Sequence, residues 1–215
     1  MVKGARRRGG PGGGAAGGVS PGWAEGVWPL IDARTLRARV QALGRAITRD
    51  YAGRAPTLIC VLKGASLFFA DLVRAIELPV ELEFIAVSSY AGATESSGEV
   101  RISADVTHPL AGRDVVLVED IVDTGLTASF LLDLLQARGP RSLTVCTLLE
   151  KPSRARTRVD VAYRGFVIDD VFVVGYGLDH AERWRNLPYL GVVRRTTPSG
   201  RARRGRSAAA RRPRR

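Results

Sequence analysis

Three carboxylates and two hydroxyls gather in one short run with the sequence EDIVDTGLT. The carboxylates are Glu119, Asp120 and Asp123, and the hydroxyls belong to Thr124 and Thr127. Carboxylates can hold sugar hydroxyls, whereas backbone amides at a helix start, with hydroxyls beside them, bind phosphate. Acids placed directly before a phosphate cradle therefore suggest a ribose phosphate as the ligand.

A buried strand before this run and a helix after it are expected to position its side chains. Val115 to Val118 is an unbroken apolar stretch, typical of a strand covered on both faces, and we expect the strand to end at the acids. Gly125 permits a turn, and apolar residues at helical spacing predict an amphipathic helix that continues to Gly139. Open α/β sheets bind ligands at this edge, so the acids should lie in a binding site.

The run alone leaves other functions open. Acidic pairs after apolar strands also occur in receiver domains and nucleotide hydrolases, and turns are generally rich in Asp, Thr and Gly. A nucleotide hydrolase would need a loop of the form GxxxxGK[ST], which the sequence lacks. A non-enzymatic regulator that binds RNA through basic tails is a second alternative, although the intact Asp123 and Lys151 argue against it.

The basic character of the chain comes from its ends. The chain has 215 residues, is 45% hydrophobic and carries a net charge of +12, which is enough for one domain with a core. Its two tails hold 14 of the 33 basic residues and no acid, so the middle, with 19 basic and 21 acidic residues, is nearly neutral. The folded part therefore need not bind nucleic acid.

The two tails are low in complexity and cannot bury enough apolar area to offset their ordering entropy. We expect disordered tails at residues 1–22 and 194–215 around one domain at 23–193. The basic C-terminal tail could touch RNA nonspecifically, but a solubilising role is expected. No stretch has the length of a membrane span or the apolar core of a signal peptide, so we expect no membrane association and a cytoplasmic protein.

The remaining periodicity alternates between helices and strands. Helices are predicted from Asp32 to Tyr51 and over 65–76, a buried strand over 57–62, and further strands over 80–87 and 141–149. Residues 88–100 are small and polar and too long for a simple connection, which is typical of a mobile loop. This order of elements favours an α/β fold with a mainly parallel sheet.

The run from Glu119 to Thr127 resembles the phosphoribosyl-pyrophosphate motif of type I phosphoribosyltransferases. Three further stretches narrow the resemblance to the hypoxanthine-guanine phosphoribosyltransferase family: VLKGA at 61–65, LEKPSR at 149–154 and GFVIDDVFVVGYGLDH at 165–180. The resemblance runs from about residue 25 to 193 and leaves out only the tails. It implies a central sheet flanked by helices, with a small hood built from the N-terminal and C-terminal segments of the folded part.

The resemblance also implies a role for each matching residue. Asp123 would accept a proton from the purine, and Glu119 and Asp120 would hold the ribose hydroxyls. With Asp179, these two acids would also lie beside a magnesium ion. The implied ligands of the 5′-phosphate are Asp123, Thr124, Gly125, Leu126 and Thr127. Those of the pyrophosphate are Lys63, Gly64 and Arg185, and those of the purine are Lys151, Phe172 and Val173. Ser89 and Tyr90 would belong to a lid.

The activity implied by the resemblance is the Mg²⁺-dependent transfer of a phosphoribosyl group from phosphoribosyl pyrophosphate to hypoxanthine or guanine. The products would be IMP or GMP and pyrophosphate, as in purine salvage. Members of the family are commonly homodimers or homotetramers, so one of these assemblies is expected.

Overall fold

The computed structural model describes residues 24, 26–89 and 100–193. The tails expected to be disordered, 1–22 and 194–215, lie outside the described residues, and so does Tyr90 of the expected lid. Within the described part, no helix is both long and apolar enough to cross a membrane.

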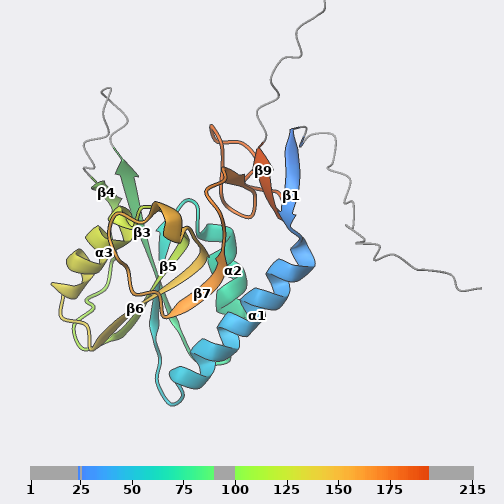
Figure 1. Ribbon diagram of the computed structural model, residues 1–215. Coiled ribbons are helices and arrows are strands. Elements are labelled where there is room, and N and C mark those ends of the chain that lie inside the picture. Colours follow the sequence, from blue (N-terminus) through green and yellow to red (C-terminus); the bar gives the residue numbers. More distant parts are fainter. Residues whose placement is uncertain (1–23, 25, 90–99, 194–215) are drawn as a thin grey trace, which may run out of the picture.

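A six-stranded sheet forms the centre of the fold, in the order β4-β3-β2-β5-β6-β7 (Figure 1). Its strands are β2 (Thr57–Leu62), β3 (Glu81–Ser89), β4 (Val100–Ala104), β5 (Asp114–Val122), β6 (Ser142–Glu150) and β7 (Tyr163–Val167). All neighbouring pairs are parallel except β3 and β4. The expected mainly parallel sheet is thus confirmed.

Helices cover both faces of this sheet, which explains its unbroken apolar strands. Alternate residues of β2 and β5 point to opposite faces, since strand side chains alternate. Leu58 and Val116 join the core under α1 (Ala33–Asp50) and α2 (Ser66–Arg74). Ile59 and Val115 join the core under α3 (Leu126–Gln136) on the other face. Strands covered in this way need apolar side chains at every position.

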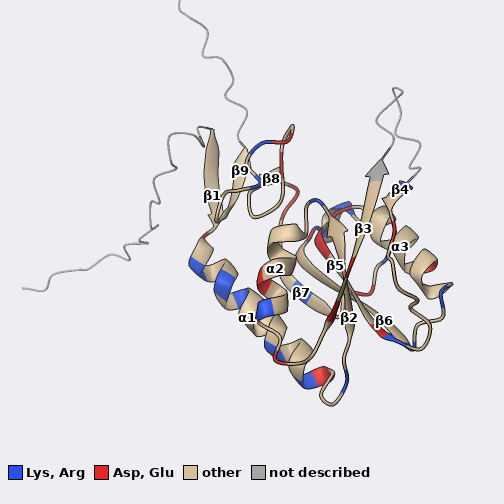
Figure 2. Ribbon diagram, turned by 180° about the vertical axis from the view of Figure 1, so that it is seen from behind, with Lys and Arg blue, Asp and Glu red and all other residues tan. Residues whose placement is uncertain are grey.

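Helix α1 begins as predicted at Asp32. The Asp32 carboxylate accepts a hydrogen bond of 2.8 Å from the backbone N–H of Thr35, which satisfies one of the free amides of the first turn. Its buried face carries Leu36, Val40 and Ile47, whereas basic residues line its outer face (Figure 2). This helix packs the core and contributes no side chain to the cavity described below.

A second, three-stranded sheet forms the expected hood beside the first turn of α1 (Figure 1). It joins β1 (Val27–Ile31) to β9 (Leu190–Val193) and β9 to β8 (Val173–Val174), with antiparallel pairing throughout. Val27, Val174 and Leu187 form its small apolar core. The hood thus combines the N-terminal and C-terminal segments of the folded part, which confirms the expected architecture.

Several predicted boundaries differ from the structure, those at the ends of β5 and α3 the most. Strand β5 does not end at Val118 but continues to Val122, because β6 extends beside it and pairs Ile121 with Leu149 and Val122 with Glu150. Helix α3 ends at Gln136, and Gly139 lies beyond it with a positive φ of 69°. The acids Glu119 and Asp120 therefore lie within a paired strand, whose backbone is more fixed than a loop would be.

Candidate active site

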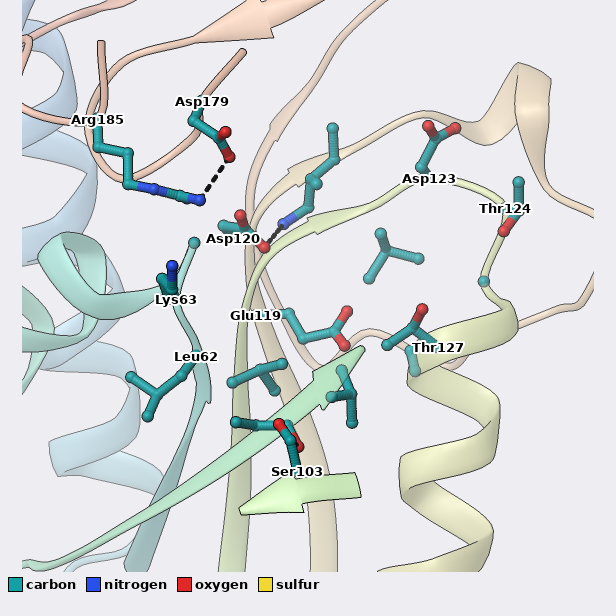
Figure 3. Close-up of a pocket in the computed structure, with 18 of the residues that line it drawn as sticks. Leu62, Lys63, Ser103, Glu119, Asp120, Asp123, Thr124, Thr127, Asp179 and Arg185 are labelled. Carbon is teal, nitrogen blue, oxygen red and sulfur yellow. Dashed lines mark hydrogen bonds and ion pairs between the residues drawn. The ribbon is translucent and has the colours of Figure 1, made fainter. Parts of the chain in front are cut away.

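A cavity of about 720 Å³ lies at the carboxyl edge of the central sheet (Figure 3). This volume is typical of sites for small ligands. The ends of β2 and β5, the turn before α3, and a segment of the hood line it. It brings together ten of the expected site residues: Lys63, Gly64, Glu119, Asp120, Asp123, Thr124, Gly125, Thr127, Asp179 and Arg185.

Glu119 and Asp120 are neighbours in β5 and therefore leave the strand on opposite sides. Glu119 is only 3% exposed, and its Oε1 finds no hydrogen-bond partner among the described residues. Burial raises the pKa of Glu119 from 4.5 to about 8, and the charge of Asp120 adds to the shift. Burial likewise raises the pKa of Asp120 to about 6. An unpartnered buried carboxylate of this kind is suited to a ligand that supplies hydroxyls or positive charge.

Position 64 must be glycine, because it lies against the Asp120 side chain. A Cβ atom at Gly64 would lie 1.8 Å from Asp120 Oδ2, and one at Gly177 would lie 2.0 Å from the Gly64 carbonyl oxygen. The Lys63-Gly64 loop is therefore pressed between β5 and the hood. The peptide bond between Leu62 and Lys63 is cis.

The turn before α3 presents backbone groups to the cavity. Gly125 has a positive φ of 81°, and a Cβ atom there would lie 2.4 Å from the Thr157 carbonyl oxygen. The Thr124 carbonyl accepts hydrogen bonds from the amides of Arg156 and Thr157. Helix α3 starts at Leu126, so its first amides and positive dipole end face the cavity. The segment around Thr157, to which the sequence assigned no role, thus supports the turn before α3.

A network of charges faces the turn from the opposite side of the cavity (Figure 3). Arg185 forms an ion pair of 2.7 Å with Asp179, and it donates a hydrogen bond of 2.8 Å to the Gly177 carbonyl oxygen. Lys63 pairs with Glu182 at 3.3 Å, and Glu182 also accepts from Arg185. Sequence reasoning missed Glu182, because only the fold brings it beside Lys63. The two cations are thus held by carboxylates that an anionic ligand would have to displace.

Asp123 and Lys151 meet where β5 and β6 leave the sheet. Lys151 Nζ lies 4.0 Å from Asp123 and 3.8 Å from Asp170, and the residue is only 6% exposed. Arg154 Nε donates a hydrogen bond of 2.6 Å to Asp123, and its Nη1 donates to Asp170 at 3.2 Å. The sequence predicted functions for Asp123 and Lys151 but none for Arg154 or Asp170, which come from a later turn and loop.

The aromatic residue expected to stack on a purine is accessible. Phe172 is 53% exposed, whereas the next residue, Val173, is buried in β8. The ring of His180 lies edge-on to Phe172, with 5.1 Å between centroids, and stacks on Trp184 at 6.1 Å. His180 was not predicted as a site residue, since a single histidine at the end of a motif carries no recognisable signal. Ser89 ends β3, at the start of the expected lid.

The acids around the cavity suit a hard cation that shares its coordination with a substrate. Among the residues that the structure describes, no three His, Cys, Asp or Glu side chains gather into a cage for a metal ion. Mg²⁺ does not need such a cage, because it is commonly held by one or two carboxylates together with substrate phosphates and water. Glu119, with its unpartnered oxygen, and the nearby Asp120 and Asp179 offer oxygen ligands of the right kind.

Comparison with known proteins identifies relatives of high similarity. Residues 31–181 match the family model of the phosphoribosyl transferase domain. The chain is 52% identical to the hypoxanthine-guanine phosphoribosyltransferase of Mycobacterium avium over 170 residues, which cover 76% of this chain and 84% of the relative. It is 46% identical to the enzyme of the same name from Bacillus subtilis over 165 residues, or 77% and 92% of the two chains.

Solved structures give the same result. A hypoxanthine-guanine phosphoribosyltransferase from Bacillus anthracis superposes with a TM-score of 0.74 at 43% identity, over 77% of this chain and 98% of that one. The hypoxanthine phosphoribosyl transferase of Trypanosoma cruzi superposes with a TM-score of 0.75 at 37% identity, over 82% and 95%.

The raised pKa of Glu119 predicts a pH-dependent stability of the ligand-free protein. Between pH 4.5 and about 8 the folded state binds a proton that the unfolded state has lost, so the free energy of unfolding falls as the pH rises. Glu119→Gln cannot titrate, and its melting temperature should fall less steeply between pH 5 and 8 than that of the wild type. Thermal melts across this range check the slope, with the exposed Glu77→Gln as control. Parallel curves for wild type and Glu119→Gln would contradict the assignment.

Proposed function

This chain belongs to the hypoxanthine-guanine phosphoribosyltransferase family, and we propose that it transfers the phosphoribosyl group of phosphoribosyl pyrophosphate to hypoxanthine or guanine. The products are IMP or GMP and pyrophosphate, which makes it an enzyme of purine salvage. The observation that carries the proposal is the meeting of Asp123 and Lys151, 4.0 Å apart, next to the phosphate turn. A proton acceptor and a hydrogen-bond donor there match the two edges of a 6-oxopurine.

The phosphate and ribose ends of the substrate are proposed to bind side by side at the carboxyl end of β5. The amides and hydroxyls from Asp123 to Thr127 hold the 5′-phosphate at the positive end of α3. Glu119 and Asp120 accept hydrogen bonds from the ribose hydroxyls, which would give the unpartnered Glu119 oxygen a donor.

Cleavage of the bond at the anomeric carbon leaves positive charge on the sugar and negative charge on the departing pyrophosphate. Lys63, the Gly64 backbone and Arg185 are proposed to hold the pyrophosphate, and Lys63 and Arg185 exchange their present carboxylate partners for phosphate oxygens. Mg²⁺, held by Glu119, Asp120 or Asp179 with the substrate, supplies further positive charge to the leaving group when it is bound.

Purine binding is proposed to use the loop between β7 and β8. Phe172 is exposed enough to stack on the ring, and the Val173 backbone lies beside it to bond the ring edge. Lys151 donates to the 6-oxo group, and Asp123 accepts the proton from the imidazole nitrogen that attacks the sugar. Ser89 and Tyr90 are assigned to the lid that excludes water.

The family also suggests a compartment and an assembly for the enzyme. We propose a cytoplasmic homodimer or homotetramer, as the resemblance to this family implies. The tails at 1–22 and 194–215 are proposed to be disordered and dispensable for turnover, since they hold few apolar residues that could pack.

Turnover itself provides the first test. Purified protein with Mg²⁺ and phosphoribosyl pyrophosphate should release pyrophosphate only when hypoxanthine or guanine is added, and IMP or GMP should appear in equal amount. Pyrophosphate and nucleotide are measured separately, with base-free reactions as the control. Base-independent release, or none with either purine, would contradict the proposed reaction.

Replacement of the proposed proton acceptor should slow the chemical step. Asp123→Asn keeps the shape of the side chain but loses its basicity, so kcat should fall by roughly a hundredfold or more. The dissociation constant of IMP should change much less, because the amide can still make hydrogen bonds. Steady-state rates and IMP titrations check both expectations, and a normal kcat in the variant would remove Asp123 from proton transfer.

Lys151 should make the enzyme reject adenine. An ammonium group only donates hydrogen bonds, so it pairs with a 6-oxo group but faces the donor amine of adenine without an acceptor. Adenine should therefore be used at least about tenfold less efficiently than hypoxanthine, because the two facing donors lose their water without gaining a hydrogen bond. Lys151→Gln offers an acceptor and should narrow the ratio of the two kcat/KM values. An unchanged ratio would exclude Lys151 from purine recognition.

A further inference from the structure

Four charged side chains around the purine end of the site form a closed cycle in which every cation meets both anions. Lys151 lies 4.0 Å from Asp123 and 3.8 Å from Asp170. Arg154 contacts the same two carboxylates at 2.6 and 3.2 Å. These residues come from the end of β5, the start and end of the short 3₁₀ turn after β6, and the loop before β8. We refer to these four residues as the charge ring.

We propose that Arg154 and Asp170 are positioning residues that keep the Lys151 ammonium available to the purine. Arg154 donates hydrogen bonds to Asp123 and Asp170. Neither carboxylate then forms a direct hydrogen bond with Lys151. Asp170 in turn holds Arg154 in place and is a second carboxylate that attracts Lys151. The inference rests on the proposed function, since it concerns how the same site recognises its 6-oxopurine.

The distances within the ring show which cation the carboxylates prefer. Arg154 reaches both acids within hydrogen-bonding distance, whereas Lys151 meets them only at 3.8 and 4.0 Å, beyond that range. A guanidinium can bridge two carboxylates through different nitrogens of one rigid plane, whereas an ammonium is a single point of charge. The ammonium therefore feels the attraction of both acids while its N–H donors stay free for a ligand.

Charge balance explains why both residues are needed. The complete ring has two cations and two anions, and Lys151 is its buried member, with 7% of its side chain exposed. Without Arg154, two carboxylates face one buried ammonium, and they would close onto it because a buried charge requires a partner. The purine would then compete with two anions for the same donors. Loss of Asp170 as well would leave one cation, Lys151, and one anion, Asp123, so that the charges balance again.

A purely structural role for the pair does not fit its surroundings. The side chains of Arg154 and Asp170 are 43% and 53% exposed and belong to no apolar cluster. Exposed ion pairs contribute little to the free energy of unfolding, so their loss should leave the melting temperature nearly unchanged. Their effect is expected on binding of the base, where Lys151 acts.

The test is a double-mutant cycle of Arg154→Gln and Asp170→Asn. In Arg154→Gln, the KM for hypoxanthine and the dissociation constant of IMP should rise roughly tenfold, equivalent to one lost charge-assisted hydrogen bond. The KM for phosphoribosyl pyrophosphate should stay within about twofold, because the change leaves the backbone amides of the turn before α3 and the proposed pyrophosphate ligands Lys63, Gly64 and Arg185 in place. Adding Asp170→Asn should bring both purine constants back to within about threefold of the wild type, and Arg154→Lys should give partial rescue.

Matched controls remove a like charge outside the ring. Asp169→Asn, next to Asp170, and Arg45→Gln, on the exposed side of α1, should both retain the wild-type constants. Thermal melts of every variant establish that the changes in binding do not come from unfolding.

The outcomes separate the two proposals. Additive or worsening effects in the double variant, or equal rises in KM for both substrates, would overturn the role of the charge ring. Absence of hypoxanthine-dependent pyrophosphate release from the wild type would overturn the proposed function. The IMP titrations would still decide whether the ring controls purine binding, since they need no turnover.

Discussion

The backbone pairing of β5 with β6 is the constraint on which the site depends. Its register places Val122 opposite Glu150, and the Lys151 amide donates a hydrogen bond of 3.0 Å to the Val122 carbonyl oxygen. Asp123 and Lys151 are the next residues of the two strands, so the ladder itself places the carboxylate and the ammonium together. A shift of one residue would turn the side chains of one strand to the other face of the sheet and separate this pair. The proposed catalytic pair is therefore a continuation of a regular sheet.

The same strand explains why adjacent acids have different environments. Glu119 follows Val115 and Leu117 on the α3 face, where burial raises its pKa to about 8. Asp120 lies on the opposite face of β5, against Gly64 and near the positive charge of Arg185. Alternation along one strand thus supplies two carboxylates of unequal acidity to one cavity.

Much of this architecture could be predicted from local sequence, and the failures have a physical cause. The apolar run of β2 and the Asp32 cap have local signals, and both elements begin where predicted. The extension of β5 through Glu119 and Asp120 could not be predicted, because polar residues stay in a strand only when a neighbouring strand pairs with them. Arg154 and Glu182 acquire their contacts from residues 31 and 119 positions away, and no spacing pattern reveals such pairs.

The hood brings the two ends of the folded part together. Val27 of β1 pairs with Val193 of β9, so residues separated by nearly the whole domain lie as close as neighbouring strands allow, about 5 Å between Cα atoms. Closing such a long loop costs entropy that local contacts do not offset, so the hood should be the last part of the chain to assemble. A short linker between these residues would make the chain circular without disturbing the sheet, and new termini could then be opened in an exposed turn such as that around Gly112.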